Sequence, residues 1–443
     1  ERGFIEQTTH DDEIRDLLGK ESVRFYIGFD PTADSLHVGH FIQIIIMMYM
    51  QKYGHTPIVL IGGGTTMVGD PSGRTDMRQL MTPEVIEENG RRFEGLFKRF
   101  MDFDEGFSYT PSGSTLGKGS VSKQPEPGKA IRMNNASWLA PLNYIEFIRD
   151  IGRHFSVNKM LAAESYKLRL EKGLNFIEFN YMLLQAYDFL HLFKNQNCVM
   201  QMGGNDQWGN MLAGIDLIRR VEGRMAHSIT FPLLVTSQGH KMGKTEKGTV
   251  WLDPTLTSPY DYYQYWVNVD DADVERFLAL FTFLPMEEVR QVRTLVDAEL
   301  NMAKSVLAYE ATVITHDRLS ADAAWQASVS AFRTRPVPPE LFPSSTIPRN
   351  PAGENLSAIV TLTKSRAELE EGLRIMAACC EAGLTASSSE ARRLIIQGGI
   401  YVNNRQVKTI DERISPKDLN DRGEIHLRKG KKKHAVIRQI TSN

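Results

Sequence analysis

Residues 23–64, VRFYIGFDPTADSLHVGHFIQIIIMMYMQKYGHTPIVLIGGG, contain the pattern that decides the fold of this 443-residue chain. Residues 23–28 predict a buried strand, residues 39–53 an apolar helix, and residues 57–61 a second strand that ends in three glycines. A strand, a helix and a strand in this order form a parallel βαβ unit, and such sheets bind ligands at the carboxyl ends of their strands. The HVGH segment, residues 37–40, and the glycine run both fall at that edge, so a ligand site is expected there.

The rest of the chain contains further structural signals. Residues 198–204 (CVMQMGG) predict another apolar strand that ends in glycines, and a helix is expected from Gly209 to Val221. Residues 260–317 show helical periodicity with few glycines, which predicts a helical domain. The six prolines between Arg335 and Pro351 are typical of a linker.

These signals predict an α/β architecture followed by two smaller parts. A Rossmann-like parallel-sheet domain is expected over residues 1–225, with a flexible insertion near 110–128 that is rich in Gly, Ser, Pro and Lys. An α-helical domain that begins with the KMGKT loop is expected over 226–334, a proline-rich linker over 335–353, and a small α+β domain over 354–443.

The end of the chain combines positive charge with a compact pattern. Residues 374–443 contain fourteen Lys and Arg against seven Asp and Glu, a formal charge of +7, whereas the rest of the chain carries −9. A helix from about Ser389 to Gln397, followed by two glycines, a strand over 400–402 and a tight turn, favours a folded module over a merely solubilising tail. We expect this module to bind an RNA backbone, through Arg392, Arg393, Arg405, Lys431, Lys432 and Lys433.

Cysteine and hydropathy patterns exclude several classes of protein. Cys198, Cys379 and Cys380 are an odd number without a metal-ligand spacing, so neither a disulfide framework nor a protein metal site is predicted. The longest apolar run, residues 41–50, is too short to span a bilayer, and nothing before Phe4 resembles a signal peptide. A soluble protein without membrane association is expected, in the cytoplasm or in an organelle matrix.

The HVGH segment has groups suited to a nucleoside triphosphate. His37 and His40 at a helix N-terminus offer two N–H donors together with the positive end of the helix dipole, and Gly39 permits close approach of a nucleotide. A single histidine in such a place is more often a helix cap or a buried side chain. The combination of two histidines and a glycine after a strand and a Pro-Thr turn favours the nucleotide site.

The second motif, residues 241–245 (KMGKT), follows a predicted strand at 231–235. Its glycine allows movement, so that Lys241, Lys244 and the Thr245 hydroxyl could close over phosphates in a transition state. Alone, this pattern would indicate an exposed basic loop. Together with HVGH it predicts nucleotidyl transfer, in which charge on a leaving pyrophosphate must be neutralised.

Five segments in order carry a resemblance to a known family. They are residues 26–40 (YIGFDPTADSLHVGH), 69–74 (GDPSGR), 180–188 (NYMLLQAYD), 201–208 (QMGGNDQW) and 241–245 (KMGKT). With them the sequence resembles the tyrosyl-tRNA synthetases of bacterial or organellar type, which are class I enzymes. The similarity covers nearly the whole chain, and the C-terminal module resembles a small RNA-binding domain shared with a ribosomal protein.

The resemblance implies a tyrosine pocket. Tyr26 and Asp188 would hydrogen-bond the substrate phenol, so that phenylalanine would leave buried polar groups unpaired, a discrimination for which this family is a known example. Asp70, Tyr181 and Gln185 would receive the substrate ammonium group. On spacing alone, Tyr181, Gln185 and Asp188 could instead form a polar stripe on one face of a helix.

The resemblance also implies an ATP site. Asp206 and Gly204 would hold the ribose, His40 would lie on the ribose side, and Gln207 would lie near the reacting carboxylate and phosphate. The pyrophosphate end would be stabilised by Thr32, His37, Lys241, Lys244 and Thr245, with Arg74 and Arg78 from a neighbouring loop. The remaining residues expected around the nucleotide are Gly28, Asp30 and Gly39.

The activity implied is a two-step one without a covalent enzyme intermediate. The carboxylate of L-tyrosine attacks ATP, bound with Mg²⁺, to give tyrosyl-adenylate and pyrophosphate, and the 3′-terminal adenosine of tRNA(Tyr) then takes the tyrosyl group. A homodimer is implied, with residues 134–161 at its interface. The alternatives are a tryptophanyl-tRNA synthetase, a small-molecule adenylyltransferase and an RNA-binding scaffold.

Overall fold

The computed structural model describes residues 1–72, 81–171, 173–239, 242–245, 248–332, 336–349, 361–403, 405–420, 423–430 and 433–440. The chain divides into two compact units. Unit 1 comprises Glu1–Thr257 with Arg276–Phe281, and unit 2 comprises Ser258–Glu275 with Thr282–Asn443.

Unit 1 is built on a six-stranded sheet. Its strand order is β1 (Gln7–Thr8), β8 (His227–Phe231), β7 (Cys198–Gly204), β2 (Arg24–Phe29), β3 (Thr56–Ile61) and β6 (Ile131–Asn134). All neighbours pair in parallel except β1, which runs antiparallel to β8. The predicted βαβ unit is confirmed, since α2 (Val38–Lys52) lies in the chain between β2 and β3. The chain order reverses between β2 and β7, and such a switch point is where doubly wound sheets bind ligands.

The remaining helices of unit 1 are α1 (Asp11–Lys20), α3 (Gly63–Thr66), α4 (Pro83–Phe97), α5 (Ala136–Leu139), α6 (Tyr144–Asp150), α7 (Val157–Leu161), α8 (Glu164–Leu170), α9 (Phe176–Gln196) and α10 (Trp208–Glu222). The long helix α9 begins at Asn175, whose side chain accepts a hydrogen bond from the Glu178 N–H at 3.0 Å. It ends at Asn197, which adopts a left-handed conformation with φ of 50°.

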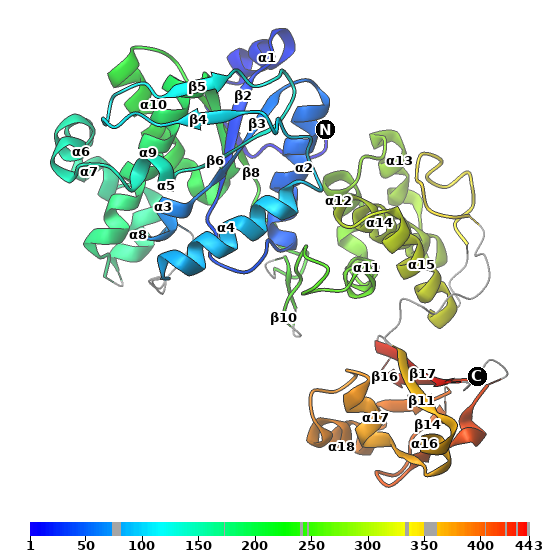
Figure 1. The fold of residues 1–443 in the computed structure, drawn as a ribbon. Coiled ribbons are helices and arrows are strands. Elements are labelled where there is room, and N and C mark those ends of the chain that lie inside the picture. Colours follow the sequence, from blue (N-terminus) through cyan, green and yellow to red (C-terminus); the bar gives the residue numbers. More distant parts are fainter. Residues whose placement is uncertain are drawn as a thin grey trace. The chain divides into compact units, whose positions relative to one another are not determined.

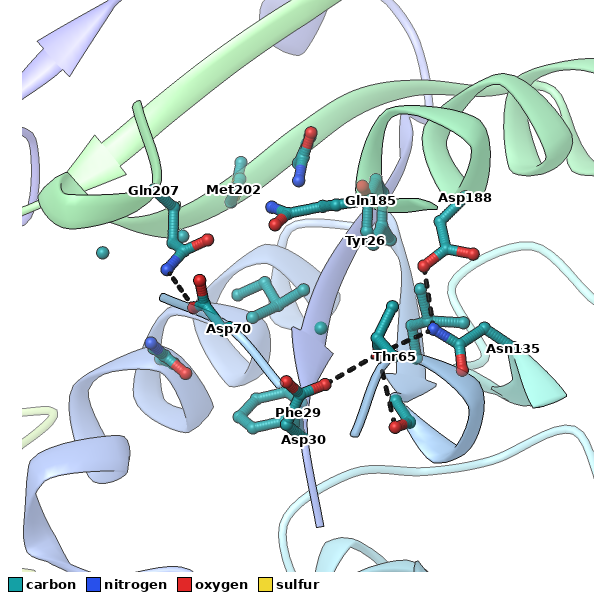
Figure 2. Close-up of a pocket in the computed structure, with 18 of the residues that line it drawn as sticks. Tyr26, Phe29, Asp30, Thr65, Asp70, Asn135, Gln185, Asp188, Met202 and Gln207 are labelled. Atoms are coloured by element: carbon teal, nitrogen blue, oxygen red, sulfur yellow. Dashed lines mark hydrogen bonds between the residues drawn. The ribbon is translucent and has the colours of Figure 1, made fainter. Parts of the chain in front are cut away.

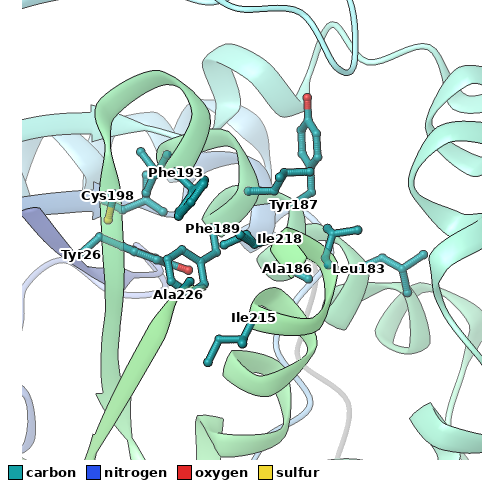
Figure 3. Close-up of a cluster of buried hydrophobic side chains, with 14 of the residues drawn as sticks. Tyr26, Leu183, Ala186, Tyr187, Phe189, Phe193, Cys198, Ile215, Ile218 and Ala226 are labelled. Atoms are coloured by element: carbon teal, nitrogen blue, oxygen red, sulfur yellow. The ribbon is translucent and has the colours of Figure 1, made fainter. Parts of the chain in front are cut away.

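Helices α9 and α10 pack closely on the sheet. A β-carbon at Gly214 of α10 would lie 3.0 Å from the Phe189 ring of α9, so the glycine permits this approach. Figure 3 shows the core around this contact, in which Tyr26 of β2 lies among Phe189, Phe193 and Ala226. The Tyr26 and Phe189 ring centroids are 5.5 Å apart. Tyr26 is therefore held by packing before any ligand binds.

Residues 110–128, predicted to be a flexible insertion, include a strand. β4 (Ser108–Thr110) pairs antiparallel with β5 (Ser120–Lys123). Between the strands, the Thr115 carbonyl accepts a hydrogen bond from the Tyr187 hydroxyl at 2.7 Å, and the Leu116 carbonyl accepts one from Lys194 at 2.9 Å. Two side chains of α9 thus hold the segment.

The first part of unit 2 is helical, as the periodicity predicted. Its helices are α11 (Pro259–Val267), α13 (Met286–Arg290), α14 (Asp297–Thr315) and α15 (Arg318–Phe332), while α12 (Val274–Phe281) is shared between the two units. The glycine-free run from Met286 to Thr315 is not one helix, because it breaks before Asp297, where φ is +48°. The buried Tyr262 and Thr315 hydroxyls, 2.9 Å apart, join α11 to α14.

The end of the chain, orange to red in Figure 1, is an α+β fold with its own core. Its sheet has the order β11 (Thr361–Ser365), β17 (Lys433–Ile440), β16 (Glu424–Lys429), β13 (Ile400–Val402) and β14 (Arg405–Gln406). The other elements are α16 (Arg366–Glu370), α17 (Ile375–Glu381), α18 (Ser388–Ile396) and the pair β12 (Leu373–Arg374) and β15 (Arg413–Ile414). The predicted helix, glycine and strand order is confirmed, with Gly398 at φ of 71° after α18. Among the described residues, no helix combines the length and apolarity needed to cross a membrane.

Candidate active site

A cavity of about 190 Å³ opens at the carboxyl ends of β2 and β7 (Figure 2). Its lining includes most of the residues that the sequence predicted for the tyrosine and ATP sites. These are Tyr26, Gly28, Asp30, Thr32, His40, Asp70, Tyr181, Gln185, Asp188, Gly204, Asp206 and Gln207. Residues from four separate segments of the sequence therefore meet in one pocket.

One end of the pocket pairs a buried phenol with a buried carboxyl group. Tyr26 and Asp188 are 1% and 2% exposed, and the Tyr26 hydroxyl has no hydrogen-bond partner among the described residues. Burial raises the pKa of Asp188 to about 7, against the opposing effect of two hydrogen bonds. Burial and the neighbouring Asp188 also raise the pKa of the Tyr26 phenol well above its ordinary value. This end can accept one further hydroxyl group as a hydrogen-bond partner.

Two residues that the sequence analysis missed hold Asp188 in place. The Asn135 amide donates to Asp188 Oδ2 and the Trp138 indole donates to Asp188 Oδ1, each at 2.8 Å. Asn135 also donates to Thr65 Oγ1 at 3.0 Å and accepts from the Gly64 N–H at 2.7 Å. Asn135 directly follows β6, but that strand has only four residues, so no periodic pattern in the sequence marked its position.

Asp70 lies in the same pocket and is bound from two sides. Its Oδ1 accepts the Ser72 N–H and its Oδ2 accepts the Gln207 amide, both at 2.8 Å. Burial raises the pKa of Asp70 to about 6, and the carboxylates of Asp30 and Asp206 add to the rise. A cation beside these carboxylates would be favourable. It would offset the cost of burying the Asp70 charge and the repulsion between Asp70 and the carboxylates of Asp30 and Asp206.

Asp30, at the end of β2, links the two sides of the pocket. It accepts hydrogen bonds from Thr65 Oγ1 at 2.8 Å and from the Tyr181 hydroxyl at 3.1 Å (Figure 2 draws the Thr65 bond). A β-carbon at Gly62 would lie 2.0 Å from Asp30 Oδ1. Gly62, the first glycine after β3, therefore leaves the space that this carboxylate occupies.

The HVGH segment begins α2 as predicted. The Gly39 N–H donates to His37 Nδ1 at 3.0 Å, and the His37 N–H donates to His40 Nδ1 at 3.2 Å. The two imidazole rings lie with centroids 4.1 Å apart. His40 lines the pocket, whereas His37 caps the helix beside it. The two interpretations of HVGH are thus compatible, because His37 caps the helix while His40 faces the pocket proposed for the nucleotide.

The described part of the KMGKT motif lies against HVGH. The Gly243 carbonyl accepts the Val250 N–H at 2.9 Å, and the Val250 carbonyl accepts the Val38 N–H at 3.0 Å. A β-carbon at Gly243, where φ is 79°, would lie 3.2 Å from the Gly39 nitrogen. The backbones of the two motifs thus adjoin, although about two hundred residues separate them. Three predicted residues, Lys241, Arg74 and Arg78, lie outside the described residues, as do the side chains of Lys244 and Thr245.

The predicted RNA contacts differ in their surroundings. Arg392 and Arg393 are exposed on α18. Arg405 is paired with Glu412 at 2.5 Å and lies 3.8 Å from Asp418, and Lys433 donates to the Gly383 carbonyl at 2.5 Å. Lys431 and Lys432 lie outside the described part of the chain.

Two family models match the chain in succession. One, described as tRNA synthetases class I (W and Y), matches residues 19–333, and the other, described as Tyrosine–tRNA ligase SYY-like C-terminal domain, matches residues 360–437. The tyrosine–tRNA ligase of Syntrophus aciditrophicus is 58% identical over 438 residues, which are 99% of this chain and 97% of the relative. This chain belongs to the tyrosine–tRNA ligase family.

Further members of the tyrosine–tRNA ligase family match over similar lengths. The tyrosine–tRNA ligase of Caldanaerobacter subterraneus is 50% identical, with 98% of this chain and 96% of the relative covered. Among solved structures, the C-terminally truncated mitochondrial tyrosyl-tRNA synthetase of Aspergillus nidulans aligns with a TM-score of 0.63 and 29% identity. That alignment covers 75% of this chain and 92% of the other. The class I synthetase fold and the family resemblance are thereby confirmed.

Proposed function

We propose that this chain joins L-tyrosine to tRNA(Tyr) in two steps at the pocket described above. The tyrosine carboxylate attacks the α-phosphorus of ATP, the bond to pyrophosphate breaks, and tyrosyl-adenylate forms. The 3′-terminal adenosine of the tRNA then attacks the tyrosyl carbonyl and AMP leaves. The observation that carries this proposal is the buried Tyr26 and Asp188 pair at the end of a pocket that also contains Asp70.

The polar end of the pocket suits the phenol of tyrosine. Asp188 is held by two donors, so its remaining lone pairs can accept from a substrate hydroxyl, while Tyr26 supplies a second group for that hydroxyl. Phenylalanine would bury the same groups without a partner, which is the strongest basis for rejecting it. Asp70, with Tyr181 and Gln185 on α9, would receive the ammonium group of the substrate.

The strand ends would hold the nucleotide. Gly204 ends β7, Asp206 lies just beyond it, and both would contact the ribose, with Gln207 near the reacting carboxylate and phosphate. Gly28 and Asp30 would contact the nucleotide from the end of β2. ATP would enter with its Mg²⁺ ion as part of the substrate.

The two motifs would meet at the pyrophosphate. The adjoining backbones of HVGH and residues 242–245 support this part of the proposal. Charge on the leaving pyrophosphate would be stabilised in the transition state, where preorganised donors contribute most to rate. The side chains proposed for this role are Thr32, His37, His40, Lys241, Lys244, Thr245, Arg74 and Arg78.

The C-terminal module would bind tRNA. Arg392 and Arg393 are exposed on one helix, and phosphate contacts of this kind supply affinity that falls steeply with salt. Replacing both by alanine should lower tRNA charging while leaving tyrosine-dependent ATP–pyrophosphate exchange unchanged. Equal loss of both activities would contradict this assignment.

We also propose that the protein is a homodimer in the cytoplasm. A groove of about 900 Å³ in unit 1 is lined partly by residues of the segment 134–161 expected at the interface, and by apolar side chains of which Leu212, Met225 and Leu233 are exposed. A second copy would cover these apolar groups. The Leu212→Glu variant should convert a dimer to a monomer in light scattering, and an unchanged mass would contradict this interface.

The experiment that tests the function is ATP–pyrophosphate exchange with each of the twenty amino acids. Tyrosine alone should stimulate exchange, because it alone presents both a phenol and an ammonium group to the pocket. Stimulation by tryptophan would indicate the related synthetase, and exchange without any amino acid would indicate another adenylyltransferase. Either result would refute the proposal.

A further inference from the structure

Three side chains with metal-binding atoms converge at the edge of the sheet in unit 1, outside the proposed tyrosine pocket. His10 immediately precedes α1, Glu13 lies in its first turn, and His227 is the first residue of β8. One ligand atom of each residue lies within 4.8 Å of those of the other two. In the part of the chain that the structure describes, no other group of three or more His, Cys, Asp or Glu residues meets this spacing.

The two histidines have buried nitrogen atoms that nothing in the described structure satisfies. His227 is 8% exposed, and the Nδ1 atoms of both His227 and His10 are buried without a hydrogen-bond partner among the described residues. Their rings meet edge to face, with centroids 5.8 Å apart. Buried polar atoms without partners are rare and costly in native proteins. A ligand held between the two rings would remove this cost.

The charges around the cluster favour a cation. The N-terminus of α1 carries the positive end of the helix dipole, which by itself would oppose a cation. Three carboxylates in the first turn, from Asp11, Asp12 and Glu13, reverse that sign. Asp11 is paired with Arg15 at 2.8 Å, so Asp12 and Glu13 supply the local negative charge.

We propose that His10, Glu13 and His227 bind one divalent transition-metal ion, of which zinc fits best. Two imidazoles and one carboxylate are a known zinc donor set, and water can take the fourth position. Zinc holds its N and O ligands at about 2.0–2.2 Å, so the three ligand atoms must move together by roughly 1 Å. Glu13 is exposed and can make this movement without repacking the core.

The site would fasten the N-terminal segment to the sheet. Strand β1 pairs with β8 through Gln7 and Thr8, and the Gln7 amide donates to Asn205 Oδ1 at 2.6 Å. Asn205 begins the turn that presents Asp206 to the pocket. A metal ion beside β1 would therefore stabilise the edge of the sheet next to the proposed ribose site without contacting substrate.

The test uses the full-length protein without a polyhistidine tag, after chelation and exchange into chelator-free buffer without ATP. Equilibrium dialysis against ZnCl₂ should give one Zn²⁺ per chain, and the same Zn²⁺ should raise the thermal unfolding midpoint by several degrees. Millimolar Mg²⁺ should neither displace the zinc nor reproduce the shift, since Mg²⁺ prefers oxygen ligands.

The variants are His10→Gln with His227→Gln, and Glu13→Gln alone. The double variant should lose zinc binding and the thermal shift, and Glu13→Gln should weaken binding at least tenfold. His426→Gln and Glu21→Gln are the matched controls, because they remove an imidazole of the C-terminal sheet and an exposed carboxylate of unit 1, both outside the cluster. Tyrosine-dependent exchange should persist in all variants and so show that they fold.

Two results would overturn the proposal. One is zinc binding by the double variant with the affinity and stoichiometry of the parent protein, which would place the ion elsewhere, for instance on a cysteine. The other is a parent protein that binds no more zinc than the double variant does. Glu13→Gln keeps the test valid should the double variant fail to fold.

Discussion

Replacing Asp188 by asparagine should reduce the preference for tyrosine over phenylalanine. Both oxygens of the Asp188 carboxylate accept hydrogen bonds, from Asn135 and from Trp138, each at 2.8 Å. An asparagine has one acceptor oxygen, so its NH₂ group would face one of these two donors. Above pH 7, where a pKa of about 7 leaves Asp188 mostly ionised, the variant would therefore lose the anionic acceptor for the substrate phenol and also leave one buried donor without a partner.

The expected size follows from these contacts. A hydrogen bond to a charged group contributes about 1.5–3 kcal/mol, which corresponds to roughly 10- to 150-fold in the ratio of kcat/KM for tyrosine to that for phenylalanine. The unpaired donor should in addition lower the free energy of unfolding by about 1–3 kcal/mol. Activity with phenylalanine should change much less than activity with tyrosine, because phenylalanine makes no bond to this group.

The assay is ATP–pyrophosphate exchange with each amino acid, alongside urea unfolding. The Asp206→Asn variant is the control, because Asp206 lines the same pocket at the end of β7. It should raise the KM for ATP and leave the ratio of tyrosine to phenylalanine unchanged. A ratio in Asp188→Asn equal to that of the parent protein would refute the reasoning and remove Asp188 from substrate recognition.

Three further outcomes are expected. Because the pKa of Asp70 is raised to about 6 and an ammonium group binds the ionised form, tyrosine affinity measured by calorimetry should be constant well above pH 6 and fall about tenfold per unit below it. An Asp70→Asn variant should bind more weakly and show a shallower pH dependence; the same slope would contradict the role of Asp70. Gly62→Ala would place a β-carbon 2.0 Å from Asp30 Oδ1, so kcat/KM for exchange should fall at least about tenfold with an unchanged circular dichroism spectrum. Arg169→Met breaks an ion pair with Glu178 in which both side chains are 5% exposed, and urea unfolding should show a loss of about 3–5 kcal/mol, whereas a loss below about 1 kcal/mol would show that water reaches the pair.

Local patterns predicted the helices and strands whose apolar residues recur at a regular spacing. The strand over residues 23–28 and the helix that begins at HVGH form within one or two residues of the predicted bounds, because apolar periodicity and turn residues act locally. Site residues that lie within two residues of a strand end, such as Asp30 and Asp206, could be placed by topology alone, since parallel strands end at one edge.

Positions that depend on long-range pairing were not predictable from the sequence in the same way. Asn135 and Trp138 follow a strand of four residues, too short to show a period, and this strand comes after a segment that reads as an insertion. Their contact with Asp188 arises only because β6 joins the sheet beside β3. His10 and His227 meet for a similar reason, since β1 pairs antiparallel with β8, and no spacing in the sequence indicates it.

The two ends of the pocket are built in different ways. In the proposed reaction one end selects the amino acid and the other stabilises the leaving pyrophosphate. Asp188 at the phenol end is held by hydrogen bonds from Asn135 and Trp138 inside a packed core, so its geometry exists before substrate binds. At the other end, HVGH and residues 242–245 are joined by backbone hydrogen bonds through Val250 and by two glycines in close approach. Discrimination between amino acids requires a rigid, buried end such as the phenol end. A polar group that the wrong amino acid leaves unpaired cannot move there to find another partner. Stabilising charge on a departing pyrophosphate requires the second kind of end, where the two motifs approach closely through their backbones, so that a side chain at Gly39 or Gly243 should impair adenylate formation more than tyrosine binding.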